Sequence, residues 1–156
     1  MKRILLLLAL STVGIIASVT AAQAEVVTNN TVSYAYAGFV PCANDGAGEL
    51  MTGTIEAHNL VTSTVNDNVD AWQFAVELRG SLIGKVTGDT YRLTGLMRGT
   101  YVDSLQGDKH TSTYVSRYKL IGPGTGNNLV VRETAHVTRD GDDVVVHHDG
   151  FSIECT

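Results

Sequence analysis

The strongest constraint on the fold is a period of two in the order of apolar and polar side chains after Glu25. Alternation at this period places one set of side chains on each face of a β-strand, and it differs from the 3.6-residue period of a helix. Strands are expected at about 27–40, 50–65, 69–79, 90–102, 110–121, 129–138 and 143–155, with a short eighth piece near 82–87.

Short polar turns separate these segments, among them Asn66-Asp67-Asn68, Gln106-Gly107-Asp108 and Asp140-Gly141. Glycine, asparagine and aspartate favour such turns because they tolerate a positive φ or bond their own backbone. Strands joined in sequence by short turns predict a single antiparallel meander. We expect it to close into a small barrel of seven or eight strands, since closure removes exposed sheet edges; a β-sandwich is the alternative.

The first 24 residues predict a secretory signal peptide. A basic start at Met1-Lys2-Arg3 precedes an apolar run from Ile4 to Val19, and Ala22-Gln23-Ala24 matches the small-x-small cleavage pattern. That run has 16 residues, fewer than the roughly 20 that span a bilayer. We therefore expect a secreted or periplasmic protein with no membrane segment after cleavage, and one β-barrel domain over residues 25–156.

The charge of the expected mature chain disfavours anionic partners. Residues 25–156 hold nine basic and 16 acidic residues, a net charge of −7. An acidic surface gives no electrostatic reason to bind nucleic acid or anionic lipid, and neither is predicted as a partner.

Two cysteines, Cys42 and Cys155, predict one disulfide, because an exported chain meets an oxidising compartment. Neither cysteine carries the local signature of a catalytic thiol. Cys42 follows the first expected strand and Cys155 ends the last, so the bond would tie the two strands that must meet where a barrel closes.

The last hairpin allows a prediction of register. A three-residue loop, Arg139-Asp140-Gly141, with Gly141 at positive φ, would set Thr138 opposite Asp142 and Glu133 opposite His147. One face then carries most of the apolar residues of both strands and should be buried. His148 points to the other face, opposite Arg132, so His147 and His148 cannot bind one ion together.

Glu133, His147 and Asp149 share the predicted buried face, where charged groups are costly unless they are paired or hydrated. His147 could act as an acid or base oriented by Glu133, or the three could bind a first-row metal ion. A purely structural cross-strand pair explains the same pattern. We keep the three as catalytic candidates and predict neither a metal site nor a cofactor.

Trp72 and Phe74 share one face of their expected strand with Val76 and Leu78. They are core residues or the lining of a ligand cavity, since both patterns look alike in a sequence. We take Trp72 and Phe74 as ligand-binding candidates.

The blocks VPCANDGAGE, IGPGTGNNLVVRETAHVT and DGFSIEC resemble a family of small secreted bacterial proteins with two cysteines and an all-β pattern. The resemblance runs from Val40 to Cys155; it implies export and one small domain, but brings no activity with it. In size and pattern the chain is also similar to secreted barrels such as lipocalins, dirigent proteins and allene oxide cyclases, which is fold analogy alone.

The leading functional hypothesis is a non-enzymatic binding or envelope-associated module for a small, partly apolar molecule. The alternatives are an isomerase-like or cyclase-like enzyme with its acid/base site in the barrel lumen, and a purely structural protein. The sequence leaves the oligomeric state open.

Overall fold

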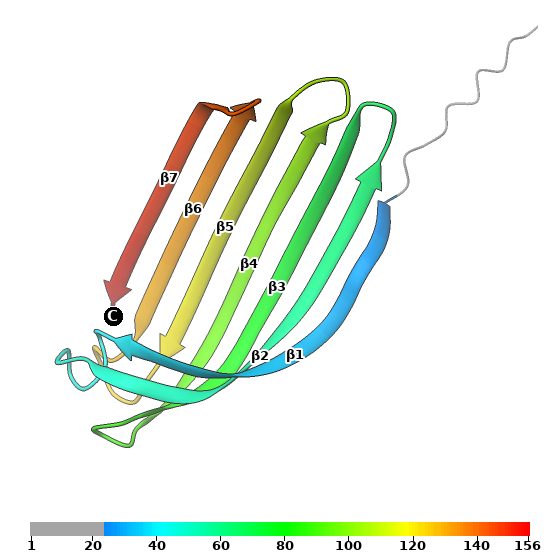
Figure 1. The fold of residues 1–156 in the computed structure, drawn as a ribbon. Helices are drawn as coiled ribbons and strands as arrows, with labels where there is room; N and C mark the ends of the chain where they lie inside the picture. The colour runs from blue at the N-terminus through cyan, green and yellow to red at the C-terminus, as the bar shows by residue number, and fades with distance from the viewer. Residues whose placement is uncertain (1–23) are drawn as a thin grey trace, which may run out of the picture.

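The computed structural model describes residues 24–156, and every regular element in that range is a β-strand (Figure 1). The predicted signal peptide lies outside the described residues, except for Ala24, where the first strand begins. The strands are β1 (Ala24–Val40), β2 (Glu49–Val65), β3 (Val69–Gly84), β4 (Thr90–Ser104), β5 (Lys109–Ile121), β6 (Leu129–Asp140) and β7 (Asp143–Cys155).

Each strand pairs antiparallel with the next one along the chain, which gives one seven-stranded sheet in the order β1 to β7. The predicted all-β class and antiparallel meander are therefore confirmed. The predicted eighth strand is wrong: β3 continues to Gly84, and residues 85–87 form a turn.

The sheet is open, because β1 and β7 are its two edges and are not hydrogen-bonded to each other. The structure therefore does not show the predicted barrel closure, and it does not show the two packed sheets of a sandwich. β1 and β7 run in the same direction, as the first and last members of an odd-numbered meander must (Figure 1). Direct pairing between them would be parallel, which is slightly less stable per residue than antiparallel pairing.

The sheet curls strongly at one end only. Figure 1 shows β1 and β2 bending across the end where β7 finishes, while the strands spread as a broad sheet at the other end. Glycines permit the close approach at the bend, since a Cβ at Gly53 would overlap the carbonyl oxygen of Ser81 and one at Gly80 would lie 2.7 Å from that of Thr54. We call the two ends the closed end and the open end.

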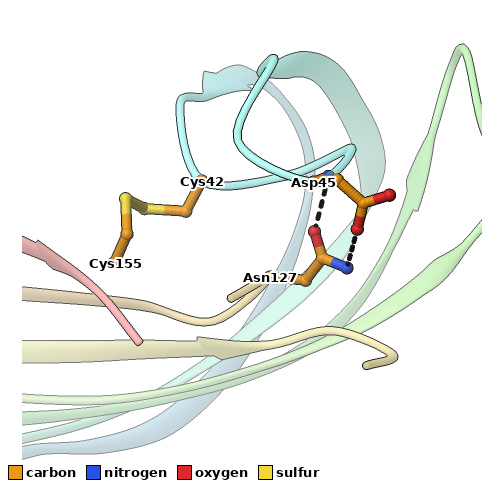
Figure 2. Close-up of a disulfide and its surroundings, with 4 residues drawn as sticks. All are labelled: Cys42, Asp45, Asn127 and Cys155. Atoms are coloured by element: carbon orange, nitrogen blue, oxygen red, sulfur yellow. Dashed lines mark hydrogen bonds between the residues drawn. A yellow bond between two sulfur atoms is a disulfide. The ribbon is translucent and has the colours of Figure 1, made fainter. Parts of the chain in front are cut away.

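Covalent and polar contacts hold the closed end together (Figure 2). The predicted bond between Cys42 and Cys155 is present, and joins the β1–β2 loop to the end of β7. Beside it, the side chain of Asn127 accepts a hydrogen bond from the backbone N–H of Asp45 at 2.8 Å and donates to the Asp45 carboxylate at 3.3 Å. An intramolecular disulfide indicates a non-reducing compartment, such as the periplasm or the cell exterior.

The core fills the closed end, on the inner surface of the curl. We call this surface the concave face. Tyr91, Met51 and Leu82 are essentially inaccessible to solvent there. They pack in one cluster with Val40, Ala43, Ile55 and Leu120. Full burial of such side chains stabilises the fold by about 1.5–3 kcal/mol each, so the closed end is the most strongly packed part of the sheet.

The predicted register of the last hairpin is wrong. Gly141 has the expected positive φ, 58°, but the turn is shorter, with Asp140 paired to Asp143 and a bulge between Thr138 and Arg139. As a result Glu133 lies opposite Phe151, not opposite His147. From Leu129 to Thr138 the two registers differ by four residues, an even number, so over this stretch they place the same side chains on the same face.

The predicted face assignment agrees with the structure on β6, where Leu129 and Val131 line the inside of the curl. On β7 the same face is not buried, because this edge strand lies where nothing covers it: Phe151 is 68% exposed and Val145 54%. Burial of β7 would require the closed barrel that the structure does not form.

Candidate functional site

The concave face encloses a pocket of about 720 Å³ next to the core. Its walls come from β1 to β6 and are mainly aliphatic and aromatic, including Tyr36, Ala57, Leu78, Met97, Tyr118 and Val131. The volume falls within the 300–1,000 Å³ that is typical of sites for small molecules. The period-two alternation builds this lining, because every second residue of each strand points into the curl.

The pocket wall on β5 contains a tyrosine that depends on a facing glycine. A Cβ at Gly95 would lie 2.6 Å from Cδ1 of Tyr118, so the tyrosine ring lies directly over the bare backbone of β4. Gly95 is the cross-strand partner of Tyr118. Glycine at this position therefore makes room for an aromatic wall.

A polar group of three residues lies just beyond the pocket lining on β5 and β6, with Ser116 two residues from Tyr118 and Glu133 two residues from Val131. The hydroxyl of Tyr114 donates a hydrogen bond to Oε2 of Glu133 at 2.9 Å. Ser116 lies directly opposite Glu133, is 1% exposed, and its Oγ has no hydrogen-bond partner among the described residues. An unpartnered hydroxyl in such a place is uncommon, since nearly all buried polar atoms find a partner.

The environment of Tyr114 changes its acidity. Burial is the main cause that raises the pKa of Tyr114 to about 12; the nearby Ser116 side chain acts to lower it, and the contact with the Glu133 carboxylate raises it. The phenol is protonated at neutral pH, as an ordinary tyrosine also is, and it donates its proton to the hydrogen bond with Glu133. Glu133 thus offers a carboxylate that can accept hydrogen bonds close to the apolar lining of the pocket.

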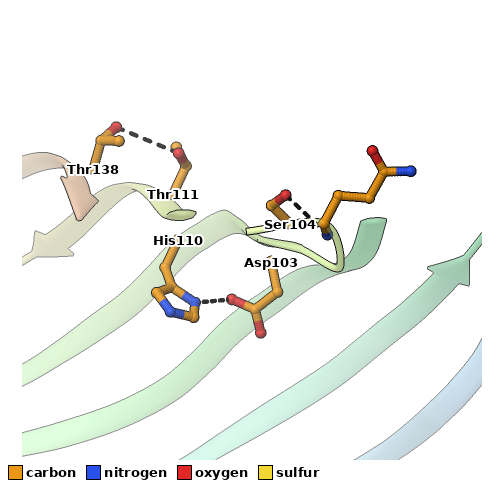
Figure 3. Close-up of polar contacts among 6 residues, drawn as sticks. Asp103, Ser104, His110, Thr111 and Thr138 are labelled. Atoms are coloured by element: carbon orange, nitrogen blue, oxygen red, sulfur yellow. Dashed lines mark hydrogen bonds and ion pairs between the residues drawn. The ribbon is translucent and has the colours of Figure 1, made fainter. Parts of the chain in front are cut away.

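A second polar group lies on the concave face near the open end (Figure 3). Nδ1 of His110 contacts Oδ1 of Asp103, its cross-strand partner on β4. Asp70 of β3 lies opposite Asp103 on the other side, and Oδ1 of Asp70 is buried without a hydrogen-bond partner among the described residues. A hydrogen bond with Asp103, followed by burial, raises the pKa of Tyr101.

Neither polar group was predicted from the sequence. Asp103 and His110 flank the turn at Gln106-Gly107-Asp108. Pairing the residues on either side of that turn in antiparallel order would have placed Asp103 opposite His110. No comparable local signal exists for Tyr114 and Glu133, because their contact depends on the register of β5 and β6 across a longer loop.

The structure does not bring the three catalytic candidates together. Glu133, His147 and Asp149 do share the concave face, but His147 lies opposite Val137 and Asp149 opposite Ala135. His147 is four residues along β7 from Phe151, the residue facing Glu133, which separates them by about 13 Å along the sheet. The predicted pairing of Glu133 with His147 is wrong, and Tyr114 takes that place.

His148 lies on the outer face, opposite His136 and not opposite Arg132 as predicted. His136 in turn contacts the hydroxyl of Thr113 through Nδ1 at 2.8 Å. Within residues 24–156, no group of three His, Cys, Asp or Glu side chains has the arrangement of a metal site.

The two ligand-binding candidates on β3 lie beyond the pocket. The pocket lining on β3 consists of Val76, Leu78 and Leu82. Phe74 and Trp72 continue the same face toward the open end, where Trp72 is 37% exposed and lies opposite Tyr101. They extend the apolar surface from the pocket toward the Asp103–His110 pair.

Comparisons with known proteins do not assign the chain to a group. No family model, no curated protein and no solved structure matches it. In the described part of the chain, no helix is long and apolar enough to cross a membrane.

Proposed function

We propose that the chain is an exported binding protein without catalytic activity, whose concave pocket takes a small, partly apolar ligand. The pocket of about 720 Å³, with its aliphatic and aromatic walls, is the observation that carries the proposal. Such concave, mainly apolar surfaces with a few polar groups are the usual form of small-molecule sites.

Export is the part of the proposal that concerns residues 1–24. Their basic start, apolar run and small-x-small end are those of a secretory signal peptide. The disulfide supports the same compartment, because such bonds persist where the surroundings are not reducing.

Glu133, close to the pocket lining, restricts which polar groups a bound ligand can carry. Glu133 accepts one hydrogen bond from Tyr114, and a carboxylate can accept several. We therefore expect a ligand with an apolar body and a hydroxyl or amine that can donate to Glu133. A ligand carboxylate would be repelled from this wall.

A role in binding fits the geometry better than acid/base catalysis by the predicted residues. His147 is exposed on the edge strand and does not face Glu133. A general base must come within hydrogen-bond reach of the reacting group, together with the residue that orients it. Glu133, His147 and Asp149 do not provide that convergence.

The test is a fluorescence titration with N-phenyl-1-naphthylamine, a neutral apolar probe, on the oxidised protein. Saturable binding is expected for the wild type. Ala57 lines the pocket, so Ala57→Phe should fill it and weaken binding at least tenfold, which is about 1.4 kcal/mol.

The matched control is Ala75→Phe, which adds the same side chain on the outer face of β3 and should leave binding unchanged. Circular dichroism and thermal melting of both variants report whether the sheet is intact. Absence of saturable binding, or equal probe affinity in a folded Ala57→Phe variant and the wild type, would contradict the proposal.

A further inference from the structure

β7 presents a long, free edge on which several apolar side chains are exposed. It pairs with β6 on one side only, and 12 of its 13 residues are exposed. Val144, Val145 and Val146, together with Phe151 and Ile153, are each between 47% and 68% exposed. A free edge of this length and composition is a template for another strand, and proteins usually protect such edges with charges, prolines or covering loops.

The sequence of β7 is complementary to itself when it is read in the antiparallel direction about His148. In that register Val145 of one copy lies opposite Phe151 of the other, and His147 opposite Asp149. Each contact occurs twice by symmetry. Aromatic side chains facing β-branched ones stabilise a sheet, and an imidazole N–H can donate a hydrogen bond to a facing carboxylate.

Neighbouring registers that keep the two concave faces on the same side lose this match. A two-fold axis at Asp149 would set that carboxylate opposite its own copy, and an axis at His147 would set Val145 opposite Asp149. An axis at Gly150 would set Phe151 opposite Asp149. Only the axis at His148 pairs imidazole with carboxylate and valine with phenylalanine.

The rest of the molecule leaves this edge accessible. The regularly paired segment would run from Val145 to Phe151, between the bulge at the start of β7 and Cys155, where the disulfide ties β7 to the β1–β2 loop. β1 does not occupy the edge, and its direction would allow only parallel pairing.

We propose that two copies of the chain associate through their β7 strands, antiparallel about His148, to form one continuous sheet. The contact is isologous: each copy contributes the same segment, and the assembly closes as a dimer. Both pockets remain on the same face of the joined sheet and accessible to ligand.

Cysteine cross-linking tests the register. His148→Cys places two thiols opposite each other at the axis, so mild oxidation should give a covalent dimer on a non-reducing gel. The control is Val146→Cys, on the same face of the same strand as His148 and also exposed. Its thiols would lie about 13 Å apart along the strands of the dimer, too far for a disulfide, so no cross-link is expected.

Charge exchange tests the contact itself, with sedimentation velocity over a range of protein concentrations as the readout. His147→Asp and Asp149→His should each weaken dimerisation at least tenfold, because each sets like groups opposite each other. The double variant His147→Asp/Asp149→His restores the pairing and should recover the wild-type dissociation constant to within about threefold. Its recovery also shows that each single variant did not simply misfold.

A wild type that stays monomeric at every concentration overturns the proposal. The proposal is also overturned if the two cysteine variants cross-link equally. The same holds if neither single charge variant changes the dissociation constant of the dimer. That last result would point to another contact surface, such as the edge of β1.

Discussion

Tyr114 on β5 donates a hydrogen bond to Glu133 on β6 at 2.9 Å, where the concave face passes from the apolar pocket to more polar surface. Together with burial, this contact raises the pKa of Tyr114 to about 12. The folded state therefore holds one more proton than the unfolded state between about pH 10 and pH 12, and its stability falls as pH rises through that window.

We predict that Tyr114→Phe removes this part of the alkaline destabilisation. The measurement is the urea midpoint as a function of pH, for the wild type and for Tyr114→Phe. Glu133→Gln should lower the pKa of Tyr114 while leaving it above its usual range, because burial remains the larger cause. Absorbance at the phenolate band against pH reads that shift, and identical titration curves for wild type and Glu133→Gln would contradict the account.

The buried carboxylate of Glu49 should make the stability of the fold depend on pH under acidic conditions. It is 2% exposed, and its carboxylate accepts bonds from the backbone N–H groups of Val86 and Thr87 and from the Thr87 hydroxyl, at 2.8 to 3.1 Å. Burial acts to raise the pKa of Glu49, but these three hydrogen bonds outweigh it and the pKa is lowered. The resulting stability is present above about pH 4.5 and is lost as the pH falls through the lowered value.

Glu49→Gln should therefore lower the melting temperature at neutral pH and flatten its decline below pH 4.5. The control is Glu56→Gln, which changes an exposed carboxylate on the same strand and should follow the wild-type curve. An unchanged acid profile in Glu49→Gln would show that this buried carboxylate does not stabilise the closed end.

Asn127 joins the two loops of the closed end. Besides its bonds with Asp45, its amide donates to the carbonyl oxygen of Pro123 at 2.7 Å, and the residue is 6% exposed. Asn127→Ala should reduce the free energy of unfolding by about 1–3 kcal/mol, because it leaves buried polar groups unpaired. Thr125→Ala, an exposed change in the same loop, should cost less than about 0.5 kcal/mol in the same urea unfolding experiment.

The disulfide closes a loop of 113 residues. In the chain-entropy model such a bond stabilises the folded state by about 4–5 kcal/mol. The double variant Cys42→Ala/Cys155→Ala should lose up to that amount in urea unfolding, and should lose affinity for the apolar probe, because Val40 and Ala43 beside Cys42 belong to the core next to the pocket. Retention of wild-type stability by this variant would show that packing alone holds the curl.

Much of the fold could be predicted from the sequence because the deciding signals are local. Alternation placed the strands, and it placed Leu129 and Val131 on the concave face. Because export to an oxidising compartment was predicted, Cys42 and Cys155 were expected to form a disulfide, and they do. The register of the last hairpin could not be predicted, because a shift of four residues leaves the side chains of Leu129 to Thr138 on the same face. The two registers differ only in the turn at Gly141 and the bulge beside it.

Whether the sheet closes into a barrel, and which side chains Glu133 contacts, cannot be predicted from the alternation of apolar and polar residues. Whether β1 reaches β7 depends on the twist and bending of the whole sheet, to which close approaches at Gly53 and Gly80 contribute. The Tyr114–Glu133 contact is diagonal across two strands, so it needed the β5–β6 register. His147, which the sequence set against Glu133, lies on the exposed edge strand.

The most direct test of the central claim is a methyl NMR titration of the oxidised protein with N-phenyl-1-naphthylamine. Saturable shifts are expected for methyl groups of the pocket, such as those of Leu78, Met97 and Leu120, and none for Leu96 and Val115 on the outer face. Shifts that occur on the outer face, or no saturable shift in the pocket, would contradict the proposal that the concave face binds a small apolar ligand.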